Sequence, residues 1–237
     1  MLPARKSAWF ERVFAVYNRH LIRRRFESLR VAGLEKMRDW PRDAPLILYA
    51  NHSSWWDALV IFQLGRVCRL EQFAMMEEKQ LREYPLFRRL GAFSVVRESP
   101  RAAAQSVEYA AELLRGTERA LWIFPQGETR PSDTRPLKFF NGVAHIIKRA
   151  GVAYAAPVAL RYEFLDEFKP QAFARVGALQ RLNAGEDFQP KTVTQELAET
   201  LTAELDQLRA DVIRGQLNEY AGIVMPQRKR VVSRSSE

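Results

Sequence analysis

The stretch that decides the fold is residues 46–62, which read LILYANHSSWWDALVIF. Its first five residues form a short aliphatic run, which is typical of a buried strand. Residues 58–62 are again apolar and can continue as a helix. His52 therefore lies where a strand ends and a helix begins, a common position for a functional site in an α/β sheet.

His52 and Asp57 are five residues apart, so they can meet only if His52 lies outside the helix. Ser54 followed by Asp57 is typical of a helix start with Ser54 as the N-cap, and it directs Asp57 back towards the loop that carries His52. A carboxylate bound to one imidazole nitrogen fixes the tautomer and leaves the other nitrogen free to act as a base. The alternative is a capped helix beside a structural histidine.

The length and composition limit the classes of protein to which the chain can belong. A chain of 237 residues can form one sizeable domain with a full core. Its single cysteine, Cys68, excludes an internal disulfide and suggests a reducing compartment. The three histidines, His20, His52 and His145, are scattered without metal-ligand spacing, so we expect no metal site.

The net charge of +9 indicates an anionic partner, such as a membrane surface, an acidic substrate or a nucleic acid. No apolar run approaches the roughly 20 residues that span a bilayer. Charges interrupt every apolar run near the N-terminus, which argues against a signal peptide. We therefore expect a cytosolic protein, or a peripheral one on the cytoplasmic face of a membrane.

Residues 1–30 concentrate the positive charge, with eight basic residues against two acidic ones. Apolar and aromatic side chains recur there at helical spacing, at Phe10, Val13, Phe14, Tyr17 and Leu21. A basic amphipathic helix with aromatic residues is typical of the membrane interface. The alternative is a helix that packs on the core with its charges solvated. Nucleic acid binding is not expected, because no nucleic-acid motif accompanies the charge.

Apolar runs and helical patterns alternate along the rest of the chain, which predicts an α/β fold with a mixed, largely parallel sheet wrapped by helices. Strands are expected at 73–76, 92–96, 120–124, 155–160 and 174–182, and helices at 79–82, 86–90, 102–115, 142–150 and 192–214. Pro157 suggests that its strand lies at an edge or begins there. Residues 1–30, 31–225 and 226–237 are predicted to form a membrane-associating segment, the main domain and a basic disordered tail.

Four blocks in this order resemble the glycerolipid and lysophospholipid acyltransferases related to bacterial 1-acylglycerol-3-phosphate acyltransferase. They are Asn51-His52-x4-Asp57, Gly91-x5-Arg97, Phe124-Pro125-x-Gly127, and a hydrophobic-proline-hydrophobic strand at 156–160. The resemblance covers about residues 46–161, half of the chain. A His-x4-Asp pair alone is common by chance, whereas four ordered blocks are specific.

The resemblance implies that His52 is the general base on an acceptor hydroxyl and that Asp57 orients it. It further implies that Arg97 and the loop after Pro125 bind the acceptor, a lysophospholipid such as lysophosphatidate. The loop residues are Gln126, Gly127, Glu128, Thr129 and Arg130. The acyl donor would be a thioester, acyl-CoA or acyl-ACP, which is a substrate, and no further cofactor is implied.

The loop departs from the family pattern Phe-Pro-Glu-Gly-Thr-Arg. Gln126 replaces the acid, and Glu128 acts as an extra residue that displaces Thr129 and Arg130 by one position. A carboxylate at 128 would oppose a phosphate unless Arg130 pairs with it. A neutral lipid alcohol or glycoside therefore stays open as the acceptor, as does a membrane-associated thioesterase that uses the same pair on water. Arg97 could equally form a surface salt bridge.

Overall fold

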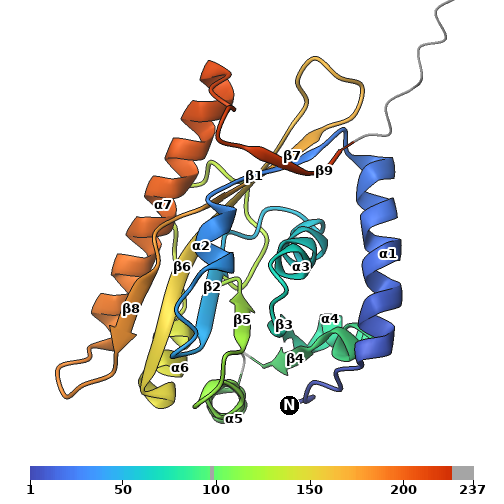
Figure 1. Cartoon of the computed structure of the whole chain (residues 1–237). Coiled ribbons are helices and arrows are strands. Elements are labelled where there is room, and N and C mark those ends of the chain that lie inside the picture. Colours follow the sequence, from blue (N-terminus) through green and yellow to red (C-terminus); the bar gives the residue numbers. More distant parts are fainter. Residues whose placement is uncertain (97–98, 226–237) are drawn as a thin grey trace, which may run out of the picture.

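The run Leu46–Ala50 forms β2, a fully buried strand inside a nine-stranded mixed sheet (Figure 1). The computed structural model describes residues 1–96 and 99–225. The other strands are β1 (Leu29–Ala32), β3 (Gln72–Glu77), β4 (Ala92–Val95), β5 (Ala120–Ile123), β6 (Val152–Glu163), β7 (Gln171–Val176), β8 (Gln180–Asn183) and β9 (Ala221–Val224). The helices are α1 (Ala8–Arg25), α2 (Leu34–Arg38), α3 (Asp57–Val67), α4 (Glu78–Glu83), the 3-10 helix η1 (Pro85–Leu90), α5 (Pro100–Leu114), α6 (Gly142–Ala150) and α7 (Pro190–Arg214).

The strand order is β4-β3-β5-β2-β6-β7-β1-β9, with β8 also paired to β6. The five strands from β4 to β6 are parallel to their neighbours, whereas β7 and β8 run antiparallel to β6. β1 is parallel to β7, and β9 is antiparallel to β1. The predicted α/β class with a mixed, largely parallel sheet is confirmed. The carboxyl ends of β2, β5 and β6 meet at one edge of the sheet, where ligands bind in open α/β folds.

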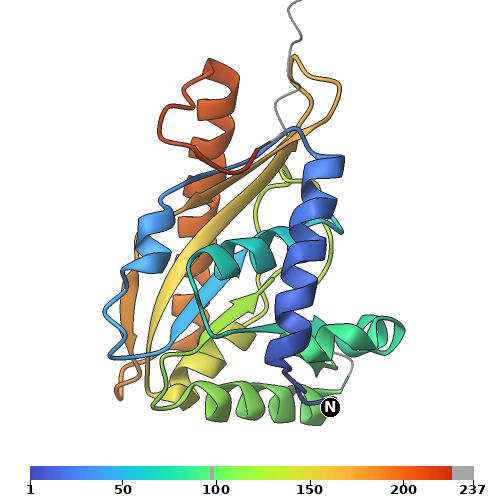
Figure 2. The same cartoon turned by 45° about the vertical axis from the view of Figure 1, so that its right-hand side comes forward.

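The sheet lies between two layers of helices (Figures 1 and 2). Successive side chains of a strand point to opposite faces. Leu46 and Leu48 of β2 join a core cluster with residues of α1, α2 and α3. Ile47 and Tyr49 join a second cluster with residues of α5, α6 and α7. The apolar run of β2 therefore supplies both cores, as expected of a central parallel strand.

Helix α1 is part of the fold and lies alongside α3 (Figures 1 and 2). Its Phe14 ring packs edge-on against Phe62 of α3, with ring centroids 5.1 Å apart. The side-chain amide of Asn18, which is buried, donates to the carbonyl of Leu59 at 3.0 Å. Ile22 lies fully in the core. The boundary predicted at residue 30 falls inside β1, and the membrane role of residues 1–30 stays a prediction.

The start of α3 differs from the sequence prediction. The helix begins at Asp57, and Trp56, not Ser54, occupies the N-cap position. The Ser54 hydroxyl accepts from the N–H of Trp56, so Ser54 closes a turn that precedes the helix. The Asp57 carboxylate accepts from the backbone N–H groups of Ser53 and Ser54. The expectation that Asp57 points back towards the His52 loop is nevertheless correct.

The position predicted for Pro157 is wrong, because β6 is an interior strand and Pro157 lies in its middle. Its carbonyl accepts from the N–H of Gly177, so its nitrogen faces the side of the strand where β7 and β8 pair. β8 pairs with residues 152–155 and β7 with 158–163. Pro157 falls between the two partners, where a missing N–H removes no ladder hydrogen bond. The single strand predicted at 174–182 is likewise two strands, β7 and β8.

Within residues 1–96 and 99–225, no helix combines the length and the apolar character that crossing a membrane requires. The predicted tail, residues 226–237, lies outside the described residues.

Candidate active site

The candidate site lies where β2 and β5 end at the same edge of the sheet. His52 follows β2 by two residues, and Phe124 directly follows β5. The two rings stack, with centroids 4.5 Å apart and planes 22° apart. The parallel pairing of β2 with β5 thus brings together two motifs that are 72 residues apart in sequence.

His52 and Asp57 form a direct pair. The imidazole Nδ1 lies 2.8 Å from Oδ2 of Asp57. The Asp57 side chain is fully buried, whereas that of His52 is 19% exposed. In the neutral tautomer with hydrogen on Nδ1, that nitrogen donates to the carboxylate and Nε2 keeps a free lone pair. The arrangement therefore places a base, the partly exposed imidazole of His52, next to the buried carboxylate of Asp57.

Both carboxylate oxygens of Asp57 are held by further donors. Oδ2 accepts from the backbone N–H of Ser53 at 2.6 Å and of Ser54 at 2.8 Å. Oδ1 accepts from the hydroxyl of Tyr162 at 2.6 Å. Burial, together with the neighbouring Asp57 charge, raises the pKa of the Tyr162 phenol well above its usual value, so the phenol stays a donor. Three fixed donors besides the imidazole orient the carboxylate.

The backbone of His52 is held by the loop that follows β5. The side-chain oxygen of Gln126 accepts from the His52 N–H at 2.8 Å. The N–H of Arg130 donates to the His52 carbonyl at 2.8 Å. An amide oxygen accepts this bond as a carboxylate oxygen would, so Gln126 retains the acceptor that an acid would supply at this position. The structure places Gln126 in a buried, supporting position beside the pair.

Consecutive residues at the end of β6 support the site, and sequence analysis missed two of them. Leu160 exchanges two backbone hydrogen bonds with the side chain of Asn51, which precedes His52. Arg161 binds Asp133 in the loop after β5, and Tyr162 binds the acid of the pair. The apolar pattern ends at residue 160, so the strand was expected to stop there, although it continues to residue 163.

A cavity of about 870 Å³ opens beside His52. Its walls are mainly aromatic and aliphatic, with side chains from both helical layers and the sheet. They include Phe14, Leu59, Phe62, Met75, Phe87 and Val107. A cavity of this size and character is typical of a site for an apolar ligand. His52 is among the residues that line this cavity, so the His52–Asp57 pair lies next to a volume suited to a hydrocarbon chain.

The structure places four of the eight predicted site residues in the wall of this cavity. Gly127, Glu128 and Thr129 line it, as His52 does. The guanidinium of Arg130 pairs with Glu128, with Nη2 2.6 Å from Oε1, and both side chains are more than half exposed. Arg97 lies outside the described residues. The acceptor-binding roles predicted for this set stay predictions.

Comparison with known proteins identifies relatives of the part of the chain that carries this site. Residues 28–161, more than half of the chain, match the model of the Acyltransferase family. The chain is 31% identical over 129 residues to a 1-acyl-sn-glycerol-3-phosphate acyltransferase of Streptococcus pneumoniae (strain ATCC BAA-255 / R6), an alignment that covers 51% of this chain and 45% of the relative. It is 29% identical over 171 residues to a lyso-ornithine lipid O-acyltransferase of Brucella abortus (strain 2308), which covers 66% and 58%. The chain thus spans about half the length of the curated relatives it matches. It belongs to the Acyltransferase family.

Proposed function

We propose that the protein transfers a fatty acyl group from a thioester, acyl-CoA or acyl-ACP, to the hydroxyl of a lysolipid by general-base catalysis. The observation that carries the proposal is the His52–Asp57 pair, with Nδ1 2.8 Å from Oδ2, in which His52 lines a large apolar cavity. Both matched relatives are named as lipid acyltransferases.

In the proposed reaction, Nε2 of His52 takes the proton of the acceptor hydroxyl as its oxygen attacks the thioester carbonyl. The new C–O bond gives a tetrahedral intermediate, which collapses as the C–S bond breaks. The thiolate leaves with the proton that His52 returns. Asp57 stabilises the imidazolium that forms in between. A thioester has a good leaving group, so the reaction needs no enzyme nucleophile.

The acyl chain would occupy the apolar cavity, which places its carbonyl next to His52. Burial of methylene groups contributes about 0.8 kcal/mol each, so the cavity can hold the donor largely through its chain. The polar loop residues at the cavity's rim would then contact the acceptor's headgroup.

We favour a lysophospholipid acceptor such as lysophosphatidate, which fits the name of the Streptococcus relative. A lysolipid without phosphate is the second candidate, and a specific contact favours it. Oε1 of Glu128 lies 2.6 Å from Nη2 of Arg130, and this ion pair leaves the guanidinium less available to bind a phosphate. The Brucella relative is named for an ornithine lipid acceptor.

The acceptor can be tested with Glu128→Gln. If the headgroup is a phosphomonoester, removing the opposing carboxylate should raise kcat/KM for lysophosphatidate by about two- to fivefold, because an exposed ion pair contributes up to about 1 kcal/mol. Transfer to lyso-ornithine lipid or monoacylglycerol should change little. Mass spectrometry of the acylated products gives both rates. The matched control is Glu118→Gln, an exposed acid paired with Arg42 at the opposite end of β5.

If the unaltered protein prefers lyso-ornithine lipid over lysophosphatidate, the phosphate acceptor is excluded in favour of the second candidate. An equal response of all acceptors to Glu128→Gln would place Glu128 outside the headgroup site.

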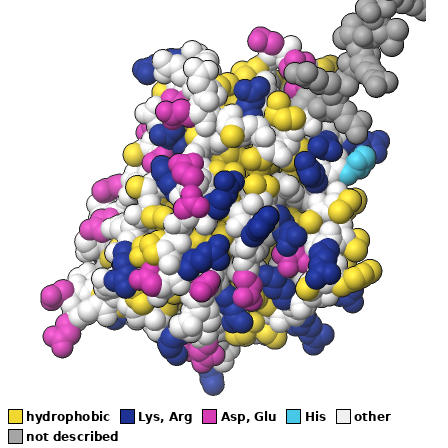
Figure 3. Space-filling model, in the orientation of Figure 1, with side chains coloured by type: hydrophobic (Ala, Val, Ile, Leu, Met, Phe, Trp, Pro, Cys, Tyr) yellow, Lys and Arg dark blue, Asp and Glu magenta, His cyan; other side chains and the backbone are white. Residues whose placement is uncertain are grey.

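We further propose that the protein binds the membrane surface peripherally through α1. Four hydrophobic side chains on one side of this helix, Trp9, Val13, Val16 and Tyr17, are each at least half exposed. Figure 3 shows hydrophobic side chains among Lys and Arg along the side of the molecule where α1 lies. Basic residues near an anionic surface contribute about 1 kcal/mol each, and salt screens this attraction.

Full-length protein should therefore sediment with anionic vesicles, less so at high salt, and Trp9→Ser/Val16→Ser should weaken binding several-fold. Substitution is preferable to deletion of residues 1–30, because Ile22 is part of the core. The matched control is Ile213→Ser on α7, which is also strongly exposed. If the control and the α1 variant bind alike, the surface contact lies elsewhere.

A further inference from the structure

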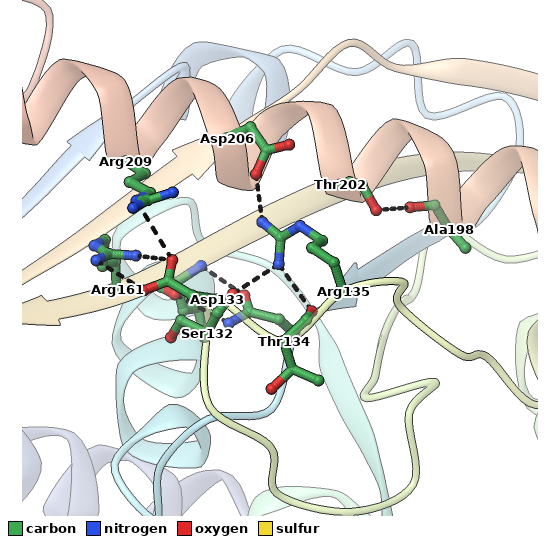
Figure 4. Close-up of polar contacts among 11 residues, drawn as sticks. Ser132, Asp133, Thr134, Arg135, Arg161, Ala198, Thr202, Asp206 and Arg209 are labelled. Atoms are coloured by element: carbon green, nitrogen blue, oxygen red, sulfur yellow. Dashed lines mark hydrogen bonds and ion pairs between the residues drawn. The ribbon is translucent and has the colours of Figure 1, made fainter.

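The loop between β5 and α6, residues 124–141, contains no helix or strand, yet side-chain ion pairs tie it to α7 (Figure 4). Its first half carries the proposed acceptor-binding residues and is bonded to His52 through Arg130. Its second half carries Asp133 and Arg135, which point towards α7 and the end of β6 (Figure 4).

Asp133 is held from two elements. Arg161 of β6 donates to its two oxygens at 2.8 and 3.3 Å, and Nε of Arg209 in α7 lies 3.7 Å away. The Arg161 side chain is only 13% exposed, so its position is fixed by its surroundings. These hydrogen bonds hold the pKa of the Asp133 carboxyl below its usual value, which keeps it charged at neutral pH.

Arg135 binds both to other residues of the loop and to helix α7. Its Nη1 donates to the carbonyls of Ser132 and Thr134, at 2.8 and 3.0 Å. Its Nη2 lies 2.5 Å from Oδ1 of Asp206 in α7. One guanidinium therefore fixes the turn of the loop and attaches it to α7.

Helix α7 offers a rigid support for these contacts. Asp206 and Arg209 are three residues apart, so they lie on the same face of the helix. The helix is 25 residues long and packs on the sheet through a row of buried leucines. The row comprises Leu197, Leu201, Leu205 and Leu208. The helix lies entirely beyond residues 28–161, the part that matches the family model.

We propose that Asp133, Arg135, Asp206 and Arg209, here called the α7 clamp, position the loop that contacts the acceptor. The clamp makes α7 a positioning element for the acceptor headgroup, and this role rests on the proposed function. Exposed ion pairs are individually weak, but a shared network that fixes one turn of a loop loses less side-chain entropy for each contact. Tyr162 of β6 supports the acid of the catalytic pair, and the loop holds His52 through residues 126 and 130, before the clamp residues Asp133 and Arg135, so the clamp should affect acceptor binding more than the chemical step.

The direct test is hydrogen–deuterium exchange in the full-length protein. Asp206→Lys places a second cation beside Arg135, and exchange in peptides covering residues 128–137 should rise by about two- to fivefold, as expected for the loss of an exposed ion pair. Asp206 is 60% exposed, so the fold should tolerate the change. The matched control is Glu199→Lys, an exposed acid of α7 whose side-chain partner is Gln195 of the same helix. Unchanged exchange in Asp206→Lys would overturn the clamp whatever the protein's activity is.

Steady-state kinetics show whether the clamp positions the loop for acceptor binding or only stabilises the fold. In Asp206→Lys the KM for the lysolipid should rise by about two- to fivefold, the same factor as the exchange rate. The kcat and the KM for the acyl thioester should change less. Adding Arg135→Glu to Asp206→Lys restores an opposite-charge pair and should recover part of both the loop's protection and the KM. A loosened loop with an unchanged acceptor KM would overturn the positioning role. Absence of acyl transfer by the unaltered protein would instead contradict the proposed function, and the exchange result would stand.

Discussion

His52→Ala should lower kcat for acyl transfer by about 10²–10⁴, the usual contribution of a general base. The imidazole supplies the only proposed path for the acceptor's proton, and His52 lines the cavity proposed to hold the acyl chain. Steady-state kinetics with a purified variant, a fixed acyl thioester and a saturating lysolipid measure the loss.

The fold should survive this substitution. The bonds from Gln126 and Arg130 to residue 52 involve its backbone, which alanine retains. The ring's contact with Phe124 is lost, so a small decrease in melting temperature is expected. Near-normal transfer by a folded His52→Ala variant would refute the role of the histidine.

Asp57→Asn should also lower kcat by about 10²–10⁴, although its shape is almost unchanged. The carboxylate accepts three N–H donors on Oδ2, from the His52 ring and the backbones of Ser53 and Ser54, and the Tyr162 hydroxyl on Oδ1. An amide has one oxygen and no charge. It can keep the three N–H donors on that oxygen, but it cannot stabilise an imidazolium. The variant's kcat at saturating substrates measures this effect.

Tyr162→Phe is the graded comparison for Asp57→Asn. It removes one hydrogen bond to the carboxylate and leaves the charge and the His52 contact in place. Loss of a hydrogen bond to a charged group costs about 1.5–3 kcal/mol, roughly 10- to 100-fold in rate if it acts wholly on the transition state. The expected order is therefore a smaller loss for Tyr162→Phe than for Asp57→Asn. A larger loss in the tyrosine variant would contradict the central role given to the Asp57 charge.

The strands that position the site, and the contact between His52 and Asp57, could be predicted from the sequence. The short apolar runs at 46–50 and 120–124 predicted buried strands, because a strand that is covered on both sides needs an apolar surface on both faces. Parallel strands end at the same edge of a sheet, which is why the motifs that follow β2 and β5 lie close together. His52 and Phe124 do meet, and Asp57 reaches His52 as its spacing indicated.

The supporting contacts could not be predicted in the same way. Tyr162 binds an acid that is 105 residues away, and the pattern of apolar residues ends two positions before it. Asp133 and Arg135 lie in an irregular loop whose partners depend on where α7 crosses the sheet. Local spacing carries no information about either contact, since both are set by the packing of distant elements.

The most direct test of the central claim is the fate of the acyl group. Purified protein is incubated with an isotope-labelled acyl thioester and a lysolipid panel, and mass spectrometry divides the label between acylated lipid and free fatty acid. The proposed function predicts label in the acylated lipid, with one thiol released per acyl group transferred, and loss of this product in His52→Ala. Label found mainly as free fatty acid in the presence of every lysolipid would contradict acyl transfer and identify a thioesterase.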